Sequence, residues 1–138
     1  ARMVRPAGFF YGANMAFKFE RPDNFAPFAV KFTDPSGGEA SIKTVFKYRT
    51  RKEFAALLND VFGTSEKIEG DQIDFVALTD KDIGRAADRL LESLVSWDVE
   101  GFALNKANLT QLADECPAAI SAMWTSYRVA CTEGRLGN

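Results

Sequence analysis

The stretch from Thr79 to Leu104 carries the strongest periodic pattern in the chain, and the rest of the fold has to cover it. Thr79 and Asp82 have the spacing of a helix N-cap, so we expect a helix to begin there and to end before the turn from Trp97 to Gly101. An amphipathic helix of this kind needs a packing partner. Its apolar residues recur at three- and four-residue spacing and so share one helical face: Ile83, Ala86, Ala87, Leu90, Leu91, Leu94 and Val95.

The length of 138 residues, with 46% hydrophobic and 26% charged residues, fits one domain with a real core. The sequence shows neither an apolar run near the roughly 20 residues that cross a bilayer nor a secretory leader pattern, so we expect a cytoplasmic protein. We expect residues 15–138 to form a single domain. Residues 1–14 are expected to be an N-terminal extension, either disordered or a remnant of cloning.

Two runs, residues 28–33 and 42–49, alternate between apolar and polar side chains, as strands with one buried face do. Between them, Pro35 presets a turn dihedral, and Gly37 and Gly38 tolerate positive φ. The two runs therefore predict an antiparallel hairpin. Phe17 and Phe19 could add an edge strand to it.

Thr50 and Glu53 form a capping box, and the apolar spacing that follows predicts a helix up to a stop at Gly63. Further along, Ile73, Phe75 and Ala77 predict either a third strand or an apolar lead into the helix beginning at Thr79.

Two more helices are expected near the C-terminus. Asn108 and Gln111 can start the first, and Pro117 suits the first turn of the last. One face of that last helix carries Ile120, Met123, Trp124, Tyr127 and Cys131, and residues 134–138 are expected to fray. Together these patterns predict an α+β fold. Its parts are an N-terminal antiparallel hairpin, a third strand as an open alternative, and about four helices.

The residue inventory argues against catalysis. The chain has no histidine, which removes the usual general base and the commonest metal ligand. Acidic Asp98 and Glu100 suit a solvated turn, and Asp80 and Asp82 suit the positive end of a helix dipole. We therefore expect no enzyme activity, no metal and no cofactor. The two cysteines, Cys116 and Cys131, fall on apolar helical positions and are expected to be reduced core thiols.

Charge is unevenly divided along the chain. Residues 1–52 carry ten Lys and Arg against four acidic residues, and residues 53–138 carry seven against fifteen. One basic stripe, Lys43, Lys47, Arg49, Arg51 and Lys52, could grip phosphates or an acidic protein surface. The neighbouring aromatic residues point to the opposite strand face, so stacking on bases from this stripe is disfavoured.

The two tryptophans could anchor an interface, because a rigid ring buries much area at little entropic cost. Trp124 shares the apolar face of the last helix and is expected in the core, whereas Trp97 at a helix end is equally open to either role. The candidate partner-binding residues are Trp97, Asp98, Lys43, Lys47, Arg49 and Arg51.

Four local patterns occur in a recognisable order over roughly residues 25–132. A strand ending at Phe46 to Arg51 runs into a helix, and a second helix leads to a Val-x-Trp-Asp turn at 95–98. An Asn-Leu-x-x-Leu helix begins at Asn108, and a Pro-started last helix carries Ile120-x-x-x-Trp124-x-x-Tyr127. In this order and spacing the chain resembles the small tail assembly chaperones of long-tailed, siphovirus-like bacteriophages and prophages.

The resemblance implies a non-enzymatic protein of the host bacterial cytoplasm. It implies transient binding to the tape-measure protein and help in recruiting tail-tube subunits. Self-association is a further expectation, which rests on the opposite charges of the two halves of the chain. No active-site residue is implied. Two alternatives stay open: a structural tail or head-tail joining protein retained in the virion, and a small nucleic-acid-binding regulator using the stripe from Lys43 to Lys52.

Overall fold

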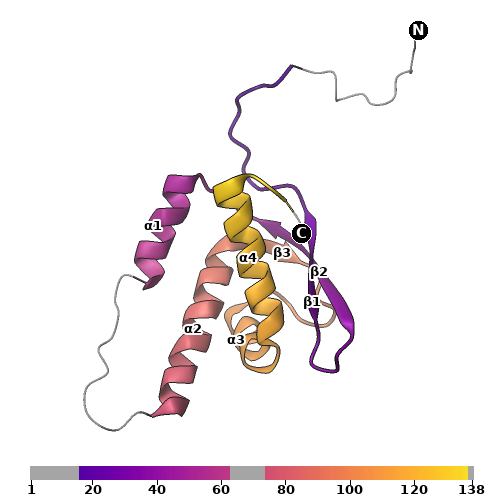
Figure 1. Ribbon diagram of the computed structural model, residues 1–138, viewed down its shortest axis with the longest axis vertical. Helices are drawn as coiled ribbons and strands as arrows, with labels where there is room; N and C mark the ends of the chain where they lie inside the picture. The colour runs from indigo at the N-terminus through magenta and orange to yellow at the C-terminus, as the bar shows by residue number, and fades with distance from the viewer. Residues whose placement is uncertain (1–15, 63–73, 137–138) are drawn as a thin grey trace.

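The computed structural model describes residues 16–62 and 74–136. In this part of the chain a three-stranded antiparallel sheet packs beside four helices, which confirms the α+β prediction (Figure 1). Strand order in the sheet follows the sequence. The elements are β1 (Phe28–Thr33), β2 (Glu39–Phe46), α1 (Arg51–Phe62), α2 (Phe75–Ser93), β3 (Leu94–Trp97), α3 (Lys106–Glu115) and α4 (Pro117–Glu133).

The predicted hairpin is confirmed as β1 and β2. The strands pair from Phe28 opposite Thr44 to Thr33 opposite Glu39. In the turn, Gly37 has a φ of 93°, which favours glycine. Asp34 accepts hydrogen bonds from the Ser36 hydroxyl and from the Gly38 amide, and these bonds lower the pKa of its carboxyl below the usual value.

Alternation along the strands decides which face of the sheet is buried. Val30, Ile42 and Phe46 are buried, and Lys31 and Lys43 lie exposed on the other face. The inner face packs against α4, which also contacts α1, α2 and α3 (Figure 1). Helix α4 is therefore the centre of the fold.

The ends of α4 are as expected. Pro117 occupies its first turn, and Gly134 closes it in the left-handed conformation with a φ of 72°. Met123 and Tyr127 on its inner face are fully buried, and the Tyr127 ring stacks on Phe46 at 4.7 Å between centroids.

The capping box at the start of α1 is confirmed. The Thr50 hydroxyl accepts from the Glu53 amide, and the Glu53 carboxylate accepts from the Thr50 amide. Phe54 and Leu57 turn inward from this helix. The expected stop at Gly63 and the extension 1–14 lie outside the described residues, as does Ile73.

The predicted start of the long helix is wrong. Helix α2 begins at Phe75, because Asp74 rather than Thr79 caps it by accepting from the Ala77 amide. Phe75 and Ala77 are consequently helical, so the segment that could have been a third strand is the first turn of α2.

The predicted end of that helix is also wrong. Helix α2 stops at Ser93, and Leu94 to Trp97 form β3, which pairs with β2. Leu94 and Val95 fit the helical spacing equally well, but the free edge of β2 supplies backbone partners at this point in the fold. The third strand therefore lies at the C-terminal end of α2.

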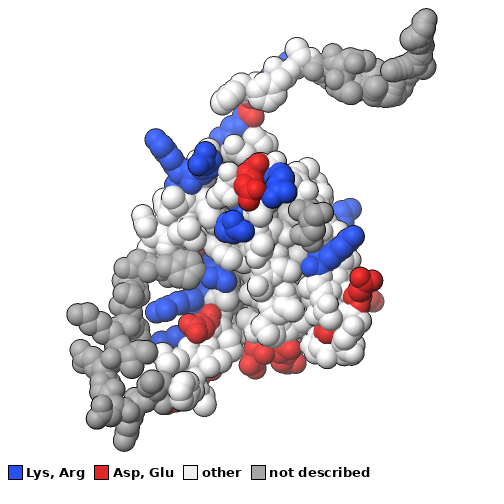
Figure 2. Space-filling view, viewed as in Figure 1, with Lys and Arg blue, Asp and Glu red and all other residues white. Residues whose placement is uncertain are grey.

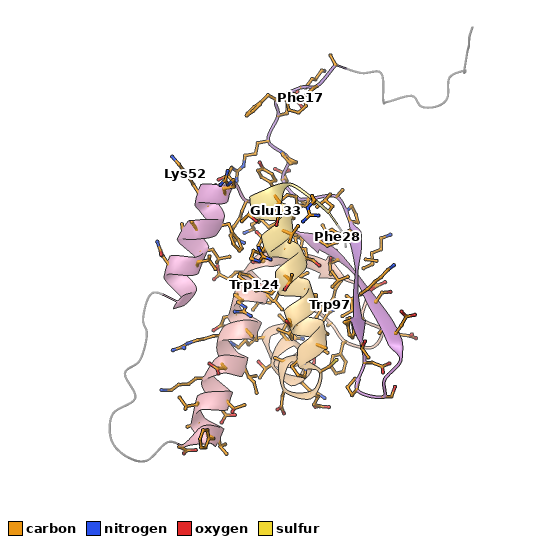
Figure 3. The ribbon with its side chains drawn as sticks, in the orientation of Figure 1. Phe17, Phe28, Lys52, Trp97, Trp124 and Glu133 are labelled. Carbon is orange, nitrogen blue, oxygen red and sulfur yellow. The ribbon has the colours of Figure 1, made fainter. Side chains whose placement is uncertain are left out.

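Two smaller differences complete the fold. Helix α3 is capped by Asn105, which accepts from the Asn108 amide, so it begins before the predicted Asn108. Phe17 and Phe19 form no strand; they lie on an exposed arm that projects from the body (Figure 3).

Candidate functional site

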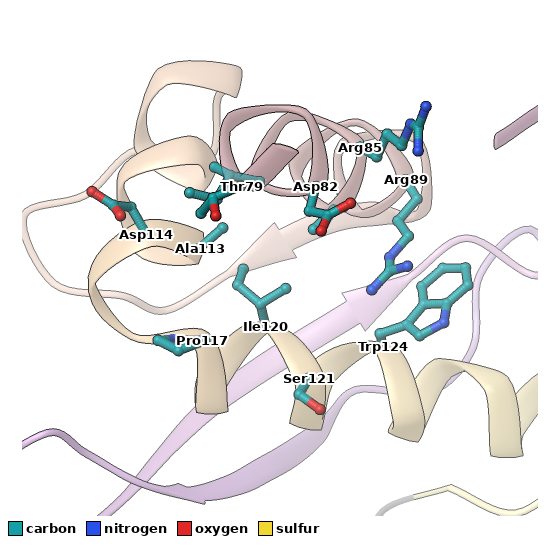
Figure 4. A pocket seen from close by; sticks show the side chains of 12 residues that line it. Thr79, Asp82, Arg85, Arg89, Ala113, Asp114, Pro117, Ile120, Ser121 and Trp124 are labelled. Atoms are coloured by element: carbon teal, nitrogen blue, oxygen red, sulfur yellow. The ribbon is translucent and has the colours of Figure 1, made fainter. Parts of the chain in front are cut away.

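A groove of about 660 Å³ runs between α2 and α4 and reaches the C-terminal end of α3 (Figure 4). We call it the α2–α4 groove. Its floor and walls are mainly apolar: Ile83, Ala86, Ala113, Pro117, Ile120 and Trp124. Its polar lining residues are Thr79, Asp82, Arg85, Arg89, Asp114 and Ser121.

The groove exists because small side chains stand where the two helices face each other. Ala86 on α2 and Ser121 on α4 cannot bridge the space between the helix backbones. Ile120, which also lines the groove, is nearly buried and closes its floor. The result is an apolar surface that one copy of the chain leaves partly uncovered.

Trp124 and Arg89 form one end of the groove. The Arg89 guanidinium lies 4.6 Å from the centre of the Trp124 ring, within the range of a cation–π contact. Burial lowers the pKa of Arg89 from its usual value, which still leaves the side chain charged near neutral pH. Trp124 is half-buried. Its ring packs against the core, as expected, and also forms part of the groove wall.

Exposed apolar residues continue this surface at the start of α2. Phe75, one turn before Thr79, is 71% exposed, and its neighbour Val76 is 73% exposed. Large exposed apolar side chains in one region are a feature of protein-binding surfaces.

Three of the predicted partner-binding residues, Lys43, Trp97 and Asp98, lie together where β2 meets β3. Asp98 accepts a 2.7 Å hydrogen bond from the Lys43 amide, and its own amide donates to the Lys43 carbonyl. The Trp97 indole donates to the Phe102 carbonyl at 2.9 Å and packs against the core. Asp98 and Trp97 thus fix the C-terminal end of β3 beside the middle of β2, while the Lys43 side chain is exposed.

The other three, Lys47, Arg49 and Arg51, follow the C-terminal end of β2. Lys47 and Arg51 are exposed. Figure 2 shows Lys and Arg side chains around the start of α1 and acidic side chains along the lower edge of the same face. Arg49 is only half-exposed because its guanidinium turns inward, so the exposed part of the basic stripe consists of the remaining residues.

Arg49 belongs to a partly buried hydrogen-bond network that sequence reasoning missed. Its guanidinium donates to the Tyr127 hydroxyl at 2.8 Å, to the Ser93 hydroxyl at 3.0 Å and to the Glu92 carbonyl at 3.2 Å. The Tyr127 hydroxyl donates in turn to the Lys47 carbonyl. Burial raises the pKa of Tyr127. A polar residue within the apolar face, Ser93, was the one available signal.

Both cysteines are free and buried, as expected for core thiols. Over residues 16–62 and 74–136, no three His, Cys, Asp or Glu side chains gather closely enough to hold a metal ion. No helix within these ranges combines the length and the apolar character that a membrane span needs.

Comparison with known proteins agrees with this description. A family model described as phage tail assembly chaperone matches residues 13–138. No curated protein and no solved structure matches the chain. The match covers most of the chain, including every element that forms the α2–α4 groove. The chain therefore belongs to the phage tail assembly chaperone family.

Proposed function

We propose that the protein binds helical segments of the tape-measure protein in the α2–α4 groove and helps recruit tail-tube subunits around it. In this proposal it acts in the cytoplasm of the host bacterium and catalyses no reaction. The observation that carries it is an open, apolar groove between two helices in a member of an assembly-chaperone family.

The groove suits a helical client in physical terms. An amphipathic helix can lay its apolar face against Ile83, Ala86 and Ile120 while its other face stays in water. From Thr79 to Arg89 the wall of α2 rises by on the order of 15 Å, the length of about three helical turns. Contacts of this size are weak and reversible, which suits a chaperone that has to release its client.

A second partner needs a second surface, and two are available. The arm bearing Phe17 and Phe19 leaves the body at the end opposite the first turn of α2 (Figures 1 and 3). Their side chains are 85% and 94% exposed. The exposed Lys47 and Arg51 lie in the same region and could contact an acidic surface of a tube subunit or of another copy.

Trp97, Asp98, Lys43 and Arg49 enter this proposal in different ways. The Lys43 side chain is free to contact a partner directly. Asp98 and Arg49 support it indirectly, because their hydrogen bonds fix the middle of β2 and the segment after its C-terminal end, from which the exposed cations project. The half-buried Trp97 stabilises the adjoining turn through the hydrogen bond from its indole N–H to the Phe102 carbonyl.

The test is co-expression with the tape-measure protein of the same phage or prophage, with soluble and co-purified client as the measurements. The informative variant is Ser121→Tyr, which fills the groove from an exposed position on α4. Its matched control is Ala118→Tyr, an exposed position on the same helix that does not line the groove.

We expect the unmodified chain and Ala118→Tyr to keep the client soluble, and Ser121→Tyr to lose this effect. A client that stays insoluble with every version would count against the chaperone role. Retained activity of Ser121→Tyr would move the client site away from the groove. Stoichiometric protein in purified virions would favour a structural role instead.

A further inference from the structure

The charged residues that line the α2–α4 groove are separated by the sign of their charge along its length. Asp114 lies at the end formed by α3 and Pro117, Asp82 lies between, and Arg85 and Arg89 lie at the end formed by Trp124 (Figure 4). Because all four line the same groove, an elongated ligand lying in it would meet negative charge at one end and positive charge at the other.

Among the residues that the structure describes, the acidic Asp88 on the same helix as Asp82 does not line the groove. Asp88 on α2 forms its ion pair with Lys106 on α3, away from the groove lining. Asp82, Arg85 and Asp114 retain solvent contact and can pair with a ligand. Arg89 keeps its charge against the Trp124 ring.

The two helices that form the walls run in the same direction. Thr79 and Pro117, near their N-terminal ends, lie at the Asp114 end of the groove, and Arg89 and Trp124 lie farther along at the other end (Figures 1 and 4). Aligned peptide dipoles give each helix a positive N-terminal end and a negative C-terminal end. A third helix is favoured when it runs antiparallel to both.

We infer that the groove binds its client helix in one direction, antiparallel to α2 and α4. An acidic N-terminal turn of the client lies against Arg85 and Arg89, and a basic C-terminal turn lies against Asp82 and Asp114. The occupant is thus an amphipathic helix of about three turns with acidic residues first and basic residues last. Such a helix is also stabilised by its own dipole.

This inference rests on the proposed function but is tested separately, with designed peptides. The first peptide is a helix of about 11 residues, or three turns, with a Leu and Ala ridge, Glu in the first turn and Lys in the last. The second has the same composition with Glu and Lys exchanged. Both carry a hydrocarbon staple opposite the ridge, so that they are equally helical when free.

Direction is measured by NMR on the unmodified full-length chain labelled with ¹⁵N. A nitroxide at the N-terminus of the first peptide should broaden the Trp124 indole and Arg89 amide signals and spare the Asp114 amide. A nitroxide at its C-terminus should do the reverse. Equal broadening at both ends, the opposite pattern, or no binding at millimolar peptide overturns the inference.

Affinity gives an independent measurement. The first peptide should bind roughly fivefold more tightly than the second, since exposed ion pairs each contribute modestly. The double variant Asp82→Lys with Arg85→Glu keeps the net charge, opposes the remaining Asp114 and Arg89 at the two ends, and should abolish the preference. Asp80→Lys with Lys81→Glu, which exchanges charges on α2 outside the groove lining, should leave the preference unchanged. An unchanged preference in the groove variant overturns the inference.

The two proposals can fail separately. If the tape-measure protein depends on an open groove for solubility but the peptides show no preferred direction, only the inference on direction fails. If the peptides bind in the expected direction and the tape-measure protein remains insoluble, the client assignment fails.

Discussion

Arg49 and Tyr127, which lie 78 residues apart in the sequence, are joined by a 2.8 Å hydrogen bond from the guanidinium to the phenol oxygen. The same guanidinium reaches Ser93 and Glu92 at the end of α2. One side chain leaving the end of β2 therefore ties together α2 and α4, the two walls of the groove.

Replacing Arg49 with Met should lower the free energy of unfolding by about 2–3 kcal/mol. The substitution leaves the hydroxyls of Ser93 and Tyr127 short of a charged donor in a poorly solvated place. Urea unfolding followed by circular dichroism measures the change. Arg51→Met, at an exposed position two residues later, should change it by less than about 0.5 kcal/mol. Equal effects of the two substitutions would mean that the Arg49 network adds little stability.

The start of α2 gives a second prediction. Asp74→Ala removes the side chain that accepts from the Ala77 amide and should cost about 1 kcal/mol. Thr79→Ala, at the residue first expected to cap the helix, should be neutral or slightly stabilising because Thr79 lies inside the helix and Ala has the higher helix propensity. Thermal unfolding of both variants measures this difference. A larger loss from Thr79→Ala would place the helix start where the sequence pattern first suggested it.

The junction of β2 and β3 gives a third. Asp98→Ala leaves the Lys43 amide without its 2.7 Å acceptor and should raise the hydrogen-exchange rate of that amide about tenfold or more. Glu100→Ala, in the same turn and with an exposed side chain, is the control and should leave the exchange rate of the Lys43 amide unchanged. Persistent protection of that amide in Asp98→Ala would show that water or another group replaces the carboxylate.

The thiol of Cys131 gives a pH-dependent prediction. Burial raises its pKa from 9.0 to about 11. Below pH 9 the thiol is protonated in both folded and unfolded chains, so stability is unaffected there. Above pH 9 the unfolded chain loses this proton first, and the folded state should lose up to about 2 kcal/mol as pH rises toward 11.

Urea unfolding between pH 8 and 11 measures this loss, with Cys131→Ala as the comparison. In the variant, the free energy of unfolding should decrease less steeply with rising pH, because no thiolate forms at position 131. Tyr127 contributes to the remaining decrease in both proteins. Identical slopes would mean that the Cys131 thiol is solvated in the folded chain. Slow alkylation of Cys131 before unfolding is a second readout.

Local patterns were sufficient for much of this fold. The alternation in β1 and β2, the glycines of their turn, the Thr50 and Glu53 capping box, and Pro117 and Gly134 at the ends of α4 all depend on residues close in sequence. Backbone dihedral preferences and period-two or helical spacing act over a few residues, so the sequence alone determined these elements. The order of the same local motifs was also enough to indicate the family.

The tertiary structure decided what depends on distant partners. Leu94 to Trp97 could continue a helix, and they form β3 because the edge of β2, about 50 residues earlier, offers backbone hydrogen bonds there. Arg49 looked like one member of a basic stripe, and only the position of Tyr127 draws it inward. The α2–α4 groove likewise depends on which small side chains meet across two separate helices, a relationship that no short stretch of sequence contains.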